Sequence, residues 1–330
     1  MHQANTSQSR RALLKTASAI AAASVLPARA QPSFAKGPVR FIVPLAAGGV
    51  ADVATRAMVP DLERLWGQPV IVDNRPGGMF AIGMQALLQA PPDGHTLMYL
   101  FNSIATIQVV HKKFNLNAQL APVTQTTTCP MVIMVAAHSP FKTVRELVDY
   151  GKANPGKLTY ASLGPGSIEH LKAVHFEQVA GFRATNVPYK SGPDMAKDVI
   201  AGLVDYVLII GSFGPMFVPN GRARLLGVLD DKRMKEFPDV PTMAEAGIPL
   251  PPLSYWGGYA VRAGTPADLV QRLHRDIAQV ASSKSVAEKI AMMTLTPVVS
   301  KAPDDFRKVI SSDLAWMTDV AKGLNLKPES

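Results

Sequence analysis

Short apolar runs alternate with helical patterns along most of this chain. Val39–Val43, Leu97–Leu100 and Met131–Ala137 are largely apolar and short enough to be buried strands. Asp52–Leu65 and Ile82–Gln89 instead carry apolar residues at the spacing of one helix face. This alternation is typical of βαβ units and largely parallel sheets, so it predicts an α/β fold.

The same alternation continues through the second half of the chain. A helix is predicted over Val144–Ala153, a strand over Leu158–Ala161 and another helix over Ile168–Val179. Further strands are expected at 185–187, 206–210, 225–229 and 255–261, and further helices at 194–201, from Pro266 onward and over 306–320. About 300 residues of such pattern suit two domains of ordinary size.

Two turns of small residues lie where a predicted strand passes into a predicted helix. The first follows Val39–Val43 and the second is Gly164–Ser167. The start of a helix presents unpaired N–H groups and the positive end of the helix dipole, so each turn is a candidate anion site. We expect Asp52 and Ser167 to cap these helices, with contact to a ligand as the alternative for Asp52 and as an added role for Ser167. The candidate contacts in the first turn are Leu45, Ala46, Ala47, Gly48, Gly49, Val50, Ala51 and Asp52.

The first thirty residues have the pattern of an export signal. Ser9–Lys15 contains a twin-arginine motif, Ala17–Leu26 is apolar, and Ala28-Arg29-Ala30 fits a cleavage site. The apolar run is too short to cross a bilayer, which takes about 20 residues. We therefore expect export to the periplasm with cleavage near Ala30, by the twin-arginine route or the ordinary secretory route. An uncleaved anchor is the alternative.

Charge and cysteine content exclude several functions. Removing residues 1–30 removes four basic residues and no acidic one, which lowers the formal net charge from +9 to +5. The remaining Lys and Arg residues are scattered, so no nucleic-acid partner is expected, although a mild positive field favours small anions. Cys129 is the only cysteine and cannot form an internal disulfide, so we expect a buried structural thiol.

Motifs of catalysis and of metal or nucleotide binding are missing from the sequence. It has no G-x-S-x-G, C-x-x-C, H-E-x-x-H or P-loop pattern, and Gly48-Gly49 lacks the order of a dinucleotide site. His170 and His175 are five positions apart and do not share a helix face as an i,i+4 metal pair would. We expect no metal, no cofactor and no enzyme activity.

Several short motifs occur in an order that is more specific than any one of them. They are Ile42-Val43-Pro44 with Gly48-Gly49 and Asp52, Asn74-Arg75-Pro76-Gly77, Pro92–Leu97, Ala153–Leu158, Val187–Lys190 and Asp239–Thr242. From about Val39 to Leu324 the chain resembles the Bug-type substrate-binding receptors of tripartite tricarboxylate transporters. The resemblance implies a small organic carboxylate as ligand, membrane transporter subunits as partners and a monomeric receptor.

The resemblance also implies the periplasmic type II fold, in which two α/β domains enclose a ligand cleft and are joined by two hinge crossovers. We expect one domain to comprise residues 36–138 and 257–330 and the other residues 139–256. The crossings then fall near His138 and Gly257.

The resemblance implies a site in which backbone N–H groups of the first turn, with ordered waters, hold the carboxylate. The segment from Gly164 to His170 faces it, with Tyr189, Lys190 and the end of the 206–210 strand nearby. Phe80 is expected to stack on the ligand or to pack internally, and Ser103 to line the cleft or to bond the strand end. Lys190 either attracts the ligand or is a solvated loop residue. The candidates beyond the first turn are Phe80, Ser103, Gly164, Gly166, Ser167, His170, Tyr189 and Ile209.

Three departures from the family pattern make this site less polar. Ala51 stands where a hydroxyl is common, Gly78–Ala81 is bulkier than usual, and Ile209 lies where an acidic residue is common. We therefore expect an aromatic or otherwise less polar carboxylate rather than citrate. A ligand-presenting receptor for a signalling sensor is the alternative function, and an exported hydrolase is a more distant one.

Overall fold

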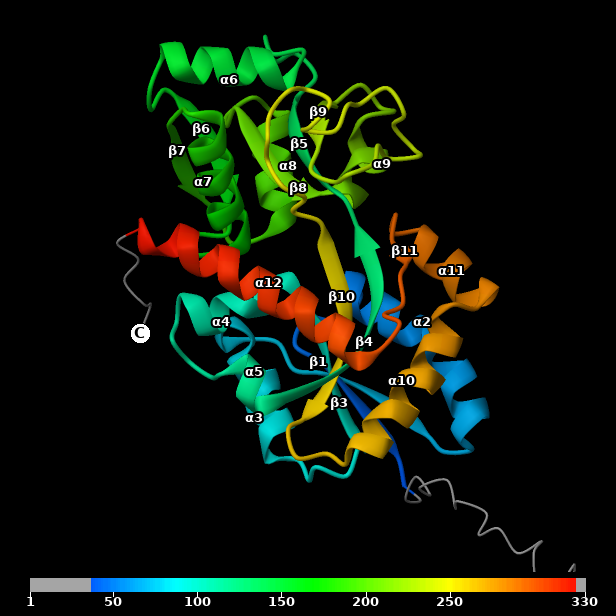
Figure 1. Ribbon diagram of the computed structural model, residues 1–330. Helices are drawn as coiled ribbons and strands as arrows, with labels where there is room; N and C mark the ends of the chain where they lie inside the picture. The colour runs from blue at the N-terminus through cyan, green and yellow to red at the C-terminus, as the bar shows by residue number, and fades with distance from the viewer. Residues whose placement is uncertain (1–36, 325–330) are drawn as a thin grey trace, which may run out of the picture. The chain divides into compact units, whose positions relative to one another are not determined.

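Two separate β-sheets organise the chain (Figure 1). The structure is a computed structural model that describes residues 37–324, and residues from Lys36 onward form one compact unit. The predicted export signal and its cleavage near Ala30 lie outside the described residues.

The first sheet has six strands in the order β11-β4-β10-β3-β1-β2. Its strands are β1 (Val39–Val43), β2 (Val70–Asn74), β3 (Thr96–Phe101), β4 (Leu120–Cys129), β10 (Tyr255–Arg262) and β11 (Thr296–Pro297). β1 is parallel to β2 and β3, whereas β10 runs antiparallel to β3 and β4. The sheet is therefore mixed rather than largely parallel, because β10 returns from the other half of the molecule.

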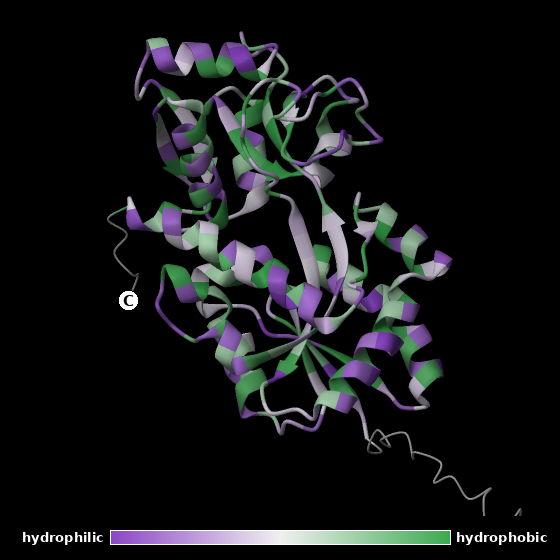
Figure 2. Ribbon diagram, in the orientation of Figure 1, coloured by the Kyte–Doolittle hydropathy of each residue, from purple (hydrophilic) through white to green (hydrophobic). Residues whose placement is uncertain are grey.

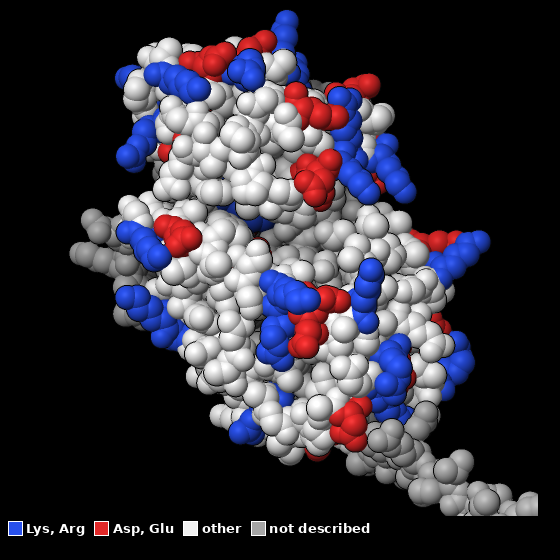
Figure 3. Space-filling view, in the orientation of Figure 1, with Lys and Arg blue, Asp and Glu red and all other residues white. Residues whose placement is uncertain are grey.

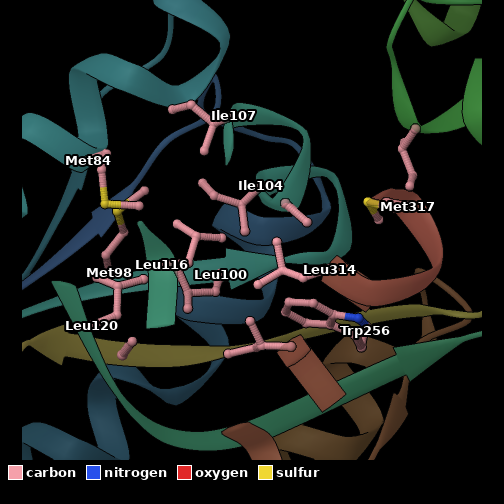
Figure 4. Close-up of a cluster of buried hydrophobic side chains, with 14 of the residues drawn as sticks. Met84, Met98, Leu100, Ile104, Ile107, Leu116, Leu120, Trp256, Leu314 and Met317 are labelled. Atoms are coloured by element: carbon pink, nitrogen blue, oxygen red, sulfur yellow. The ribbon is translucent and has the colours of Figure 1, made fainter. Parts of the chain in front are cut away.

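Helices and short helical turns flank this sheet. They are α2 (Val50–Trp66), η1 (Gly78–Phe80), α3 (Ala81–Gln89), η2 (Asn102–Ala105), α4 (Thr106–Val109), α5 (Leu116–Gln119), α10 (Ala267–Ala281), α11 (Lys284–Ala291) and α12 (Pro303–Lys322). α2 packs on β2, α3 packs on β3, and α10 and α12 pack on β4. α12 supplies Leu314 and Met317 to a buried cluster that also contains Ile104 and Trp256 (Figure 4). Burial of this apolar face is what fixes α12 against the sheet.

The second sheet has five strands in the order β7-β6-β8-β5-β9. Its elements are β5 (Met131–Ala136), α6 (Val144–Ala153), β6 (Leu158–Ser162), α7 (Ile168–Ala180), β7 (Ala184–Pro188), α8 (Gly192–Ile200), β8 (Tyr206–Ile210), η3 (Gly211–Phe213), α9 (Gly214–Phe217) and β9 (Ala223–Val228). β6 is parallel to β7 and β8, and β5 is antiparallel to β8 and β9. Strands β5, β8 and β9 are mostly hydrophobic and buried, as the green ribbon of this sheet in Figure 2 shows, because both faces of the sheet are covered there.

The chain passes twice between the two sheets. The first passage is at Pro130, between β4 and β5, and not near His138 as the sequence suggested. The expectation was wrong because Met131–Ala136 pairs with β8 and β9 of the five-stranded sheet. The return ends at Tyr255, where β10 begins, which is close to the predicted Gly257. The division into two domains at these passages remains a prediction.

The middle of β10 requires a residue without a side chain. A Cβ at Gly257 would overlap the Oη of Tyr99, which is buried and lies 2.9 Å from the Oη of Tyr255. We expect G257A to lower the free energy of unfolding by about 1–3 kcal/mol, because a packed core has no room for the added methyl group. Urea denaturation measures this value.

The matched control is G323A at the end of α12. Its Cβ would meet no atom closer than 3.7 Å, and its φ of −79° suits alanine. Its effect should stay within about 0.5 kcal/mol. A G257A protein as stable as wild type would contradict the packing described for β10.

Candidate functional site

The first glycine turn joins β1 to α2 and lies open to solvent. Residues 46–49 are exposed, and Gly49 takes the N-cap position with φ −77° and ψ 172° but no side-chain cap. The first N–H groups of a helix have no partner within it, and the dipole of a 17-residue helix adds positive potential there. Gly49 is exposed and Val50 partly exposed, so their N–H groups are the available donors of this turn, whereas Ala51 is fully buried.

Asp52 is not the cap of α2, although the sequence suggested it. It is the third residue of the helix and only 3% exposed, and its carboxylate turns back to accept from the N–H of Gly48 at 2.9 Å. Both of its oxygens also lie 3.0 Å from Nε of Arg56. The prediction failed because the helix already begins at Val50, so the acidic residue falls in its first turn. Its charge is used inside the protein and leaves Gly48 without a free N–H.

A ring of hydrogen bonds extends from Asp52 to the end of β2. Nη2 of Arg56 donates to Oδ1 of Asn74, and Nδ2 of Asn74 donates to the carbonyl of Leu45. Burial raises the pKa of Asp52, but the bonds from Arg56, Gly48 and Asn74 outweigh it and hold this pKa below its usual value. The turn is thus fixed at both ends without using its exposed donors. Asn74 and Arg56 were not among the predicted site residues, although the Asn74-Arg75-Pro76-Gly77 motif marked the place.

The segment after β2 forms an apolar wall beside this turn. A Cβ on Gly83 would lie 2.9 Å from the Cβ of Pro44, which shows how closely α3 approaches the turn. Met79 and Phe80 have φ values of 49° and 74°, in the left-handed region that costs a residue with a side chain about 1–2 kcal/mol. Phe80 packs edge-to-face on Phe101 with ring centroids 5.0 Å apart, and Met79 is 39% exposed. The packing role of Phe80 is confirmed, and stacking on a ligand remains a prediction.

The second glycine turn resembles the first in sequence but uses its donors internally. The N–H of Gly164 donates to Oγ of Ser162, that of Gly166 to Nδ1 of His170, and that of Ser167 to the carbonyl of Gly164. The hydroxyl of Ser167 accepts from the N–H of His170, so its predicted capping role is confirmed. Nδ1 of His170 is an acceptor, and burial lowers the pKa of this imidazole. His170 is therefore a neutral group that stabilises the turn.

The remaining predicted residues take different places. The hydroxyl of Tyr189 donates to Asp198 at 2.9 Å, and burial with this carboxylate raises the pKa of Tyr189 to about 12. Ser103 is partly exposed, and its carbonyl accepts from Oγ1 of Thr106 at 2.7 Å. Ile209 is 4% exposed within the hydrophobic core of the five-stranded sheet, so its side chain does not face a ligand. Successive side chains along β8 point to opposite faces of the sheet, and that of Ile209 lies on the buried face.

Metal and thiol chemistry find no support here. Among residues 37–324, no group of three or more His, Cys, Asp or Glu residues could hold a metal ion. Cys129 is free and buried, as expected, and burial raises the pKa of its thiol to about 11.

Figure 3 shows Lys and Arg scattered among Asp and Glu on the visible face, with no basic stripe. Within the described part of the chain, no helix is long and apolar enough to cross a membrane.

Two mixed sheets joined by two passages of the chain are the architecture of periplasmic solute-binding proteins. The model of the tripartite tricarboxylate transporter family receptor matches residues 54–326, and the chain belongs to this family. The chain is 30% identical to the protein BugT of Bordetella pertussis over 88% of this chain and 90% of BugT. Members of the family are solute-binding receptors and not enzymes.

Solved structures agree with this assignment. A TctC solute binding protein from Polaromonas, solved without ligand, has a TM-score of 0.77 at 25% identity and covers 87% of this chain and 98% of its own. The R. palustris protein Rpa4515 with adipate has a TM-score of 0.75 at 27% identity and covers 86% of this chain and 96% of its own. The predicted family and the two-domain periplasmic binding fold are therefore confirmed.

The ring around Asp52 makes stability depend on pH in a stated direction. Because its pKa in the folded protein lies below the usual value of 3.8, the carboxylate stabilises the fold above about pH 4. This contribution is lost as the pH falls through the folded-state pKa. We expect D52N to lower the free energy of unfolding by about 1–2 kcal/mol at pH 7, since a charge-assisted bond becomes a neutral one.

Urea denaturation of wild type and D52N at pH 7 and at pH 3 measures this dependence. The difference between the two proteins should be smaller at pH 3 than at pH 7, because the carboxylate begins to lose its contribution once the pH is below the usual pKa of 3.8. An equal difference at both pH values would show that the charge of Asp52 does not stabilise the turn.

Proposed function

We propose that this protein is an exported receptor that captures a small organic carboxylate and delivers it to a tripartite tricarboxylate-type membrane transporter. The observation that carries the proposal is the start of α2, where Gly49 and Val50 offer N–H donors that have no partner within the helix, at the end of an exposed turn. Family membership supports the same class of ligand, and the relative Rpa4515 was solved with adipate.

Backbone donors supply much of the binding free energy for such a ligand. Each hydrogen bond to a charged group contributes about 1.5–3 kcal/mol. The positive end of the helix dipole adds about 0.3–1 kcal/mol at an exposed site. Two bonds from Gly49 and Val50 with the dipole therefore give about 3–7 kcal/mol of the roughly 8 kcal/mol of micromolar affinity. Burial of the ligand's carbon atoms supplies the remainder.

The second glycine turn completes the site in this proposal. Gly164 and Gly166 shape the turn, and Ser167 and His170 keep it rigid through their bonds to its backbone. This turn would meet the ligand beside the place where it already abuts the other half, since a Cβ on Gly166 would lie 2.6 Å from Cγ1 of Val110. With the passages at Pro130 and Ser254 as boundaries, the domains would be residues 36–129 with 255–330, and residues 131–253.

The ligand is proposed to be less polar than citrate. Ala51 provides no hydroxyl beside the donors, and Met79 and Phe80 present apolar surface next to the turn. Such a wall favours a monocarboxylate or dicarboxylate with an aliphatic or aromatic body, because burial of its carbon atoms adds about 25 cal/mol per Å².

Residues 1–30 are proposed as a cleaved twin-arginine signal that delivers the receptor to the periplasm as a monomer. The motif Ser9–Lys15 and the Ala28-Arg29-Ala30 site support this part of the proposal.

Replacing Val50 by proline tests the backbone donors directly. Proline at the first position of a helix removes one N–H and keeps the helical φ, and the extended Gly49 before it tolerates proline. We expect V50P to weaken binding about tenfold or more, with the free energy of unfolding within about 1 kcal/mol of wild type. Calorimetry with malate, adipate, benzoate, phenylacetate and citrate identifies the ligand and measures the loss.

K284P is the matched control for V50P. Lys284 is the first residue of α11, follows an extended N-cap residue and is absent from the proposed site. Its replacement should leave affinity unchanged. If V50P binds as tightly as K284P, the start of α2 is not the anion site. If no carboxylate in the panel binds the wild-type protein, the proposed function fails.

Phe80 provides a test of ligand class. We expect F80A to weaken binding of benzoate or phenylacetate at least fivefold more than binding of malate, because only the aromatic acids would use its ring. The control is F114A, since Phe114 also has a positive φ of 62° and packs on the edge of the same cluster. Equal losses for every acid in the F80A protein would assign Phe80 to packing alone.

A further inference from the structure

Lys172 is a buried charge that the proposed carboxylate contacts do not use. It lies on α7 and is only 1% exposed, although a lysine is almost never buried without a partner. Its Nζ donates to the carbonyl of Leu253 at 2.7 Å. Burial lowers the pKa of Lys172 to about 8, against the attraction of Asp313 and Glu169. A group this costly to bury calls for an account of what it holds in place.

The acceptor of Lys172 lies in the return passage from β9 to β10. The N–H of Leu253 donates to the carbonyl of Leu229 at 3.0 Å, just after β9. At the next residue, the carbonyl of Ser254 accepts from Nδ2 of Asn102, and its hydroxyl donates to Asp230. The passage is therefore held by groups from both sheets, and Lys172 is the contribution of α7.

Asp313 of α12 accepts hydrogen bonds from two tryptophan side chains on the other side of Lys172. Its two oxygens accept from Nε1 of Trp256 at 2.6 Å and from Nε1 of Trp316 at 2.8 Å. The ring of Trp316 stacks on His175 of α7 with centroids 5.8 Å apart. Lys172 thus lies where α7, α12 and the return passage meet. These groups line a hollow of about 440 Å³, whose walls include Lys172, Leu253, Trp256, Asp313 and Trp316.

The position of α7 determines the position of the second glycine turn. Lys172 follows the N-cap Ser167 by five residues, which is about 7.5 Å along a helix. Gly166 lies directly against Val110, the residue that follows α4. A Cβ on this glycine would lie 2.6 Å from Cγ1 of Val110. A shift of α7 would therefore move the turn against a surface that has no free space.

We propose that Lys172 is a positioning residue for ligand capture, whose bond to the Leu253 carbonyl fixes the start of α7 and the Gly164–Ser167 turn relative to the return passage. It does not touch the ligand. The proposal rests on the proposed function only for its effect on affinity, because the position of the turn can be measured without ligand.

The first measurement is amide hydrogen exchange in the ligand-free, full-length mature protein. In K172M we expect exchange in residues 164–170 to accelerate tenfold or more, while the amides of residues 49–52 exchange as in wild type. Methionine keeps the length of the side chain and removes the buried charge, which favours a folded protein. K197M removes an exposed lysine from α8 and should change neither segment.

The second measurement is calorimetry with whichever of malate, adipate, benzoate, phenylacetate and citrate binds wild type most tightly. K172M should bind at least tenfold more weakly, and K172R, which retains a cationic donor, should recover most of the affinity. If K172M does not fold, K172Q replaces it in both measurements, because glutamine keeps a donor but no charge.

Unchanged exchange in residues 164–170 of a folded K172M protein overturns the positioning role, whatever the affinity. Faster exchange with unchanged affinity overturns the link to capture. If wild type binds no acid in the panel, the proposed function fails, and the exchange measurement still decides whether Lys172 positions the turn.

Discussion

The start of α2 must be held rigid while its N–H groups stay unpaired, and the rest of the site depends on this constraint. The protein meets it by turning the carboxylate of Asp52 inward, onto the N–H of Gly48 and the guanidinium of Arg56. Arg56 and Asn74 carry the bonds on to the carbonyl of Leu45. An acidic side chain in the first turn would otherwise compete with an anionic ligand for the same donors. Here its charge stabilises the turn from behind.

The second turn solves a different problem with a similar sequence. Gly164, Gly166 and Ser167 have their N–H groups bonded to neighbouring atoms of the same segment, and proline at position 165 has none to offer. This turn therefore contributes shape and fixed position more than free donors. That position is fixed by α7. This is why the buried ammonium of Lys172 on α7, and the return passage that it bonds, matter for ligand capture. The two turns are thus unequal partners rather than a symmetric pair.

Strand and helix order, the cap at Ser167 and the family were predictable because they follow from local periodicity and short motifs. The role of Asp52 was not, since the helix begins at Val50 and its cap is Gly49, three residues before the acid that the sequence offered as the cap. The crossing at Pro130 was missed because an apolar run such as Met131–Ala136 does not reveal which sheet it joins. The place of Ile209 could not be predicted for a similar reason, because strand pairing decides which face of β8 is buried. The role of Lys172 could not be predicted from the sequence, because its acceptor lies 81 residues away at Leu253.

The most direct test of the central claim is the amide NMR spectrum of the protein during titration with the carboxylate that binds it most tightly. We expect the N–H resonances of Gly49 and Val50 to move downfield most, because they become donors to the carboxylate. The resonance of Gly48, already bonded to Asp52, should move little. Shifts confined to other parts of the chain, with the Gly49 and Val50 resonances unchanged at saturation, would contradict the claim that the start of α2 binds the anion.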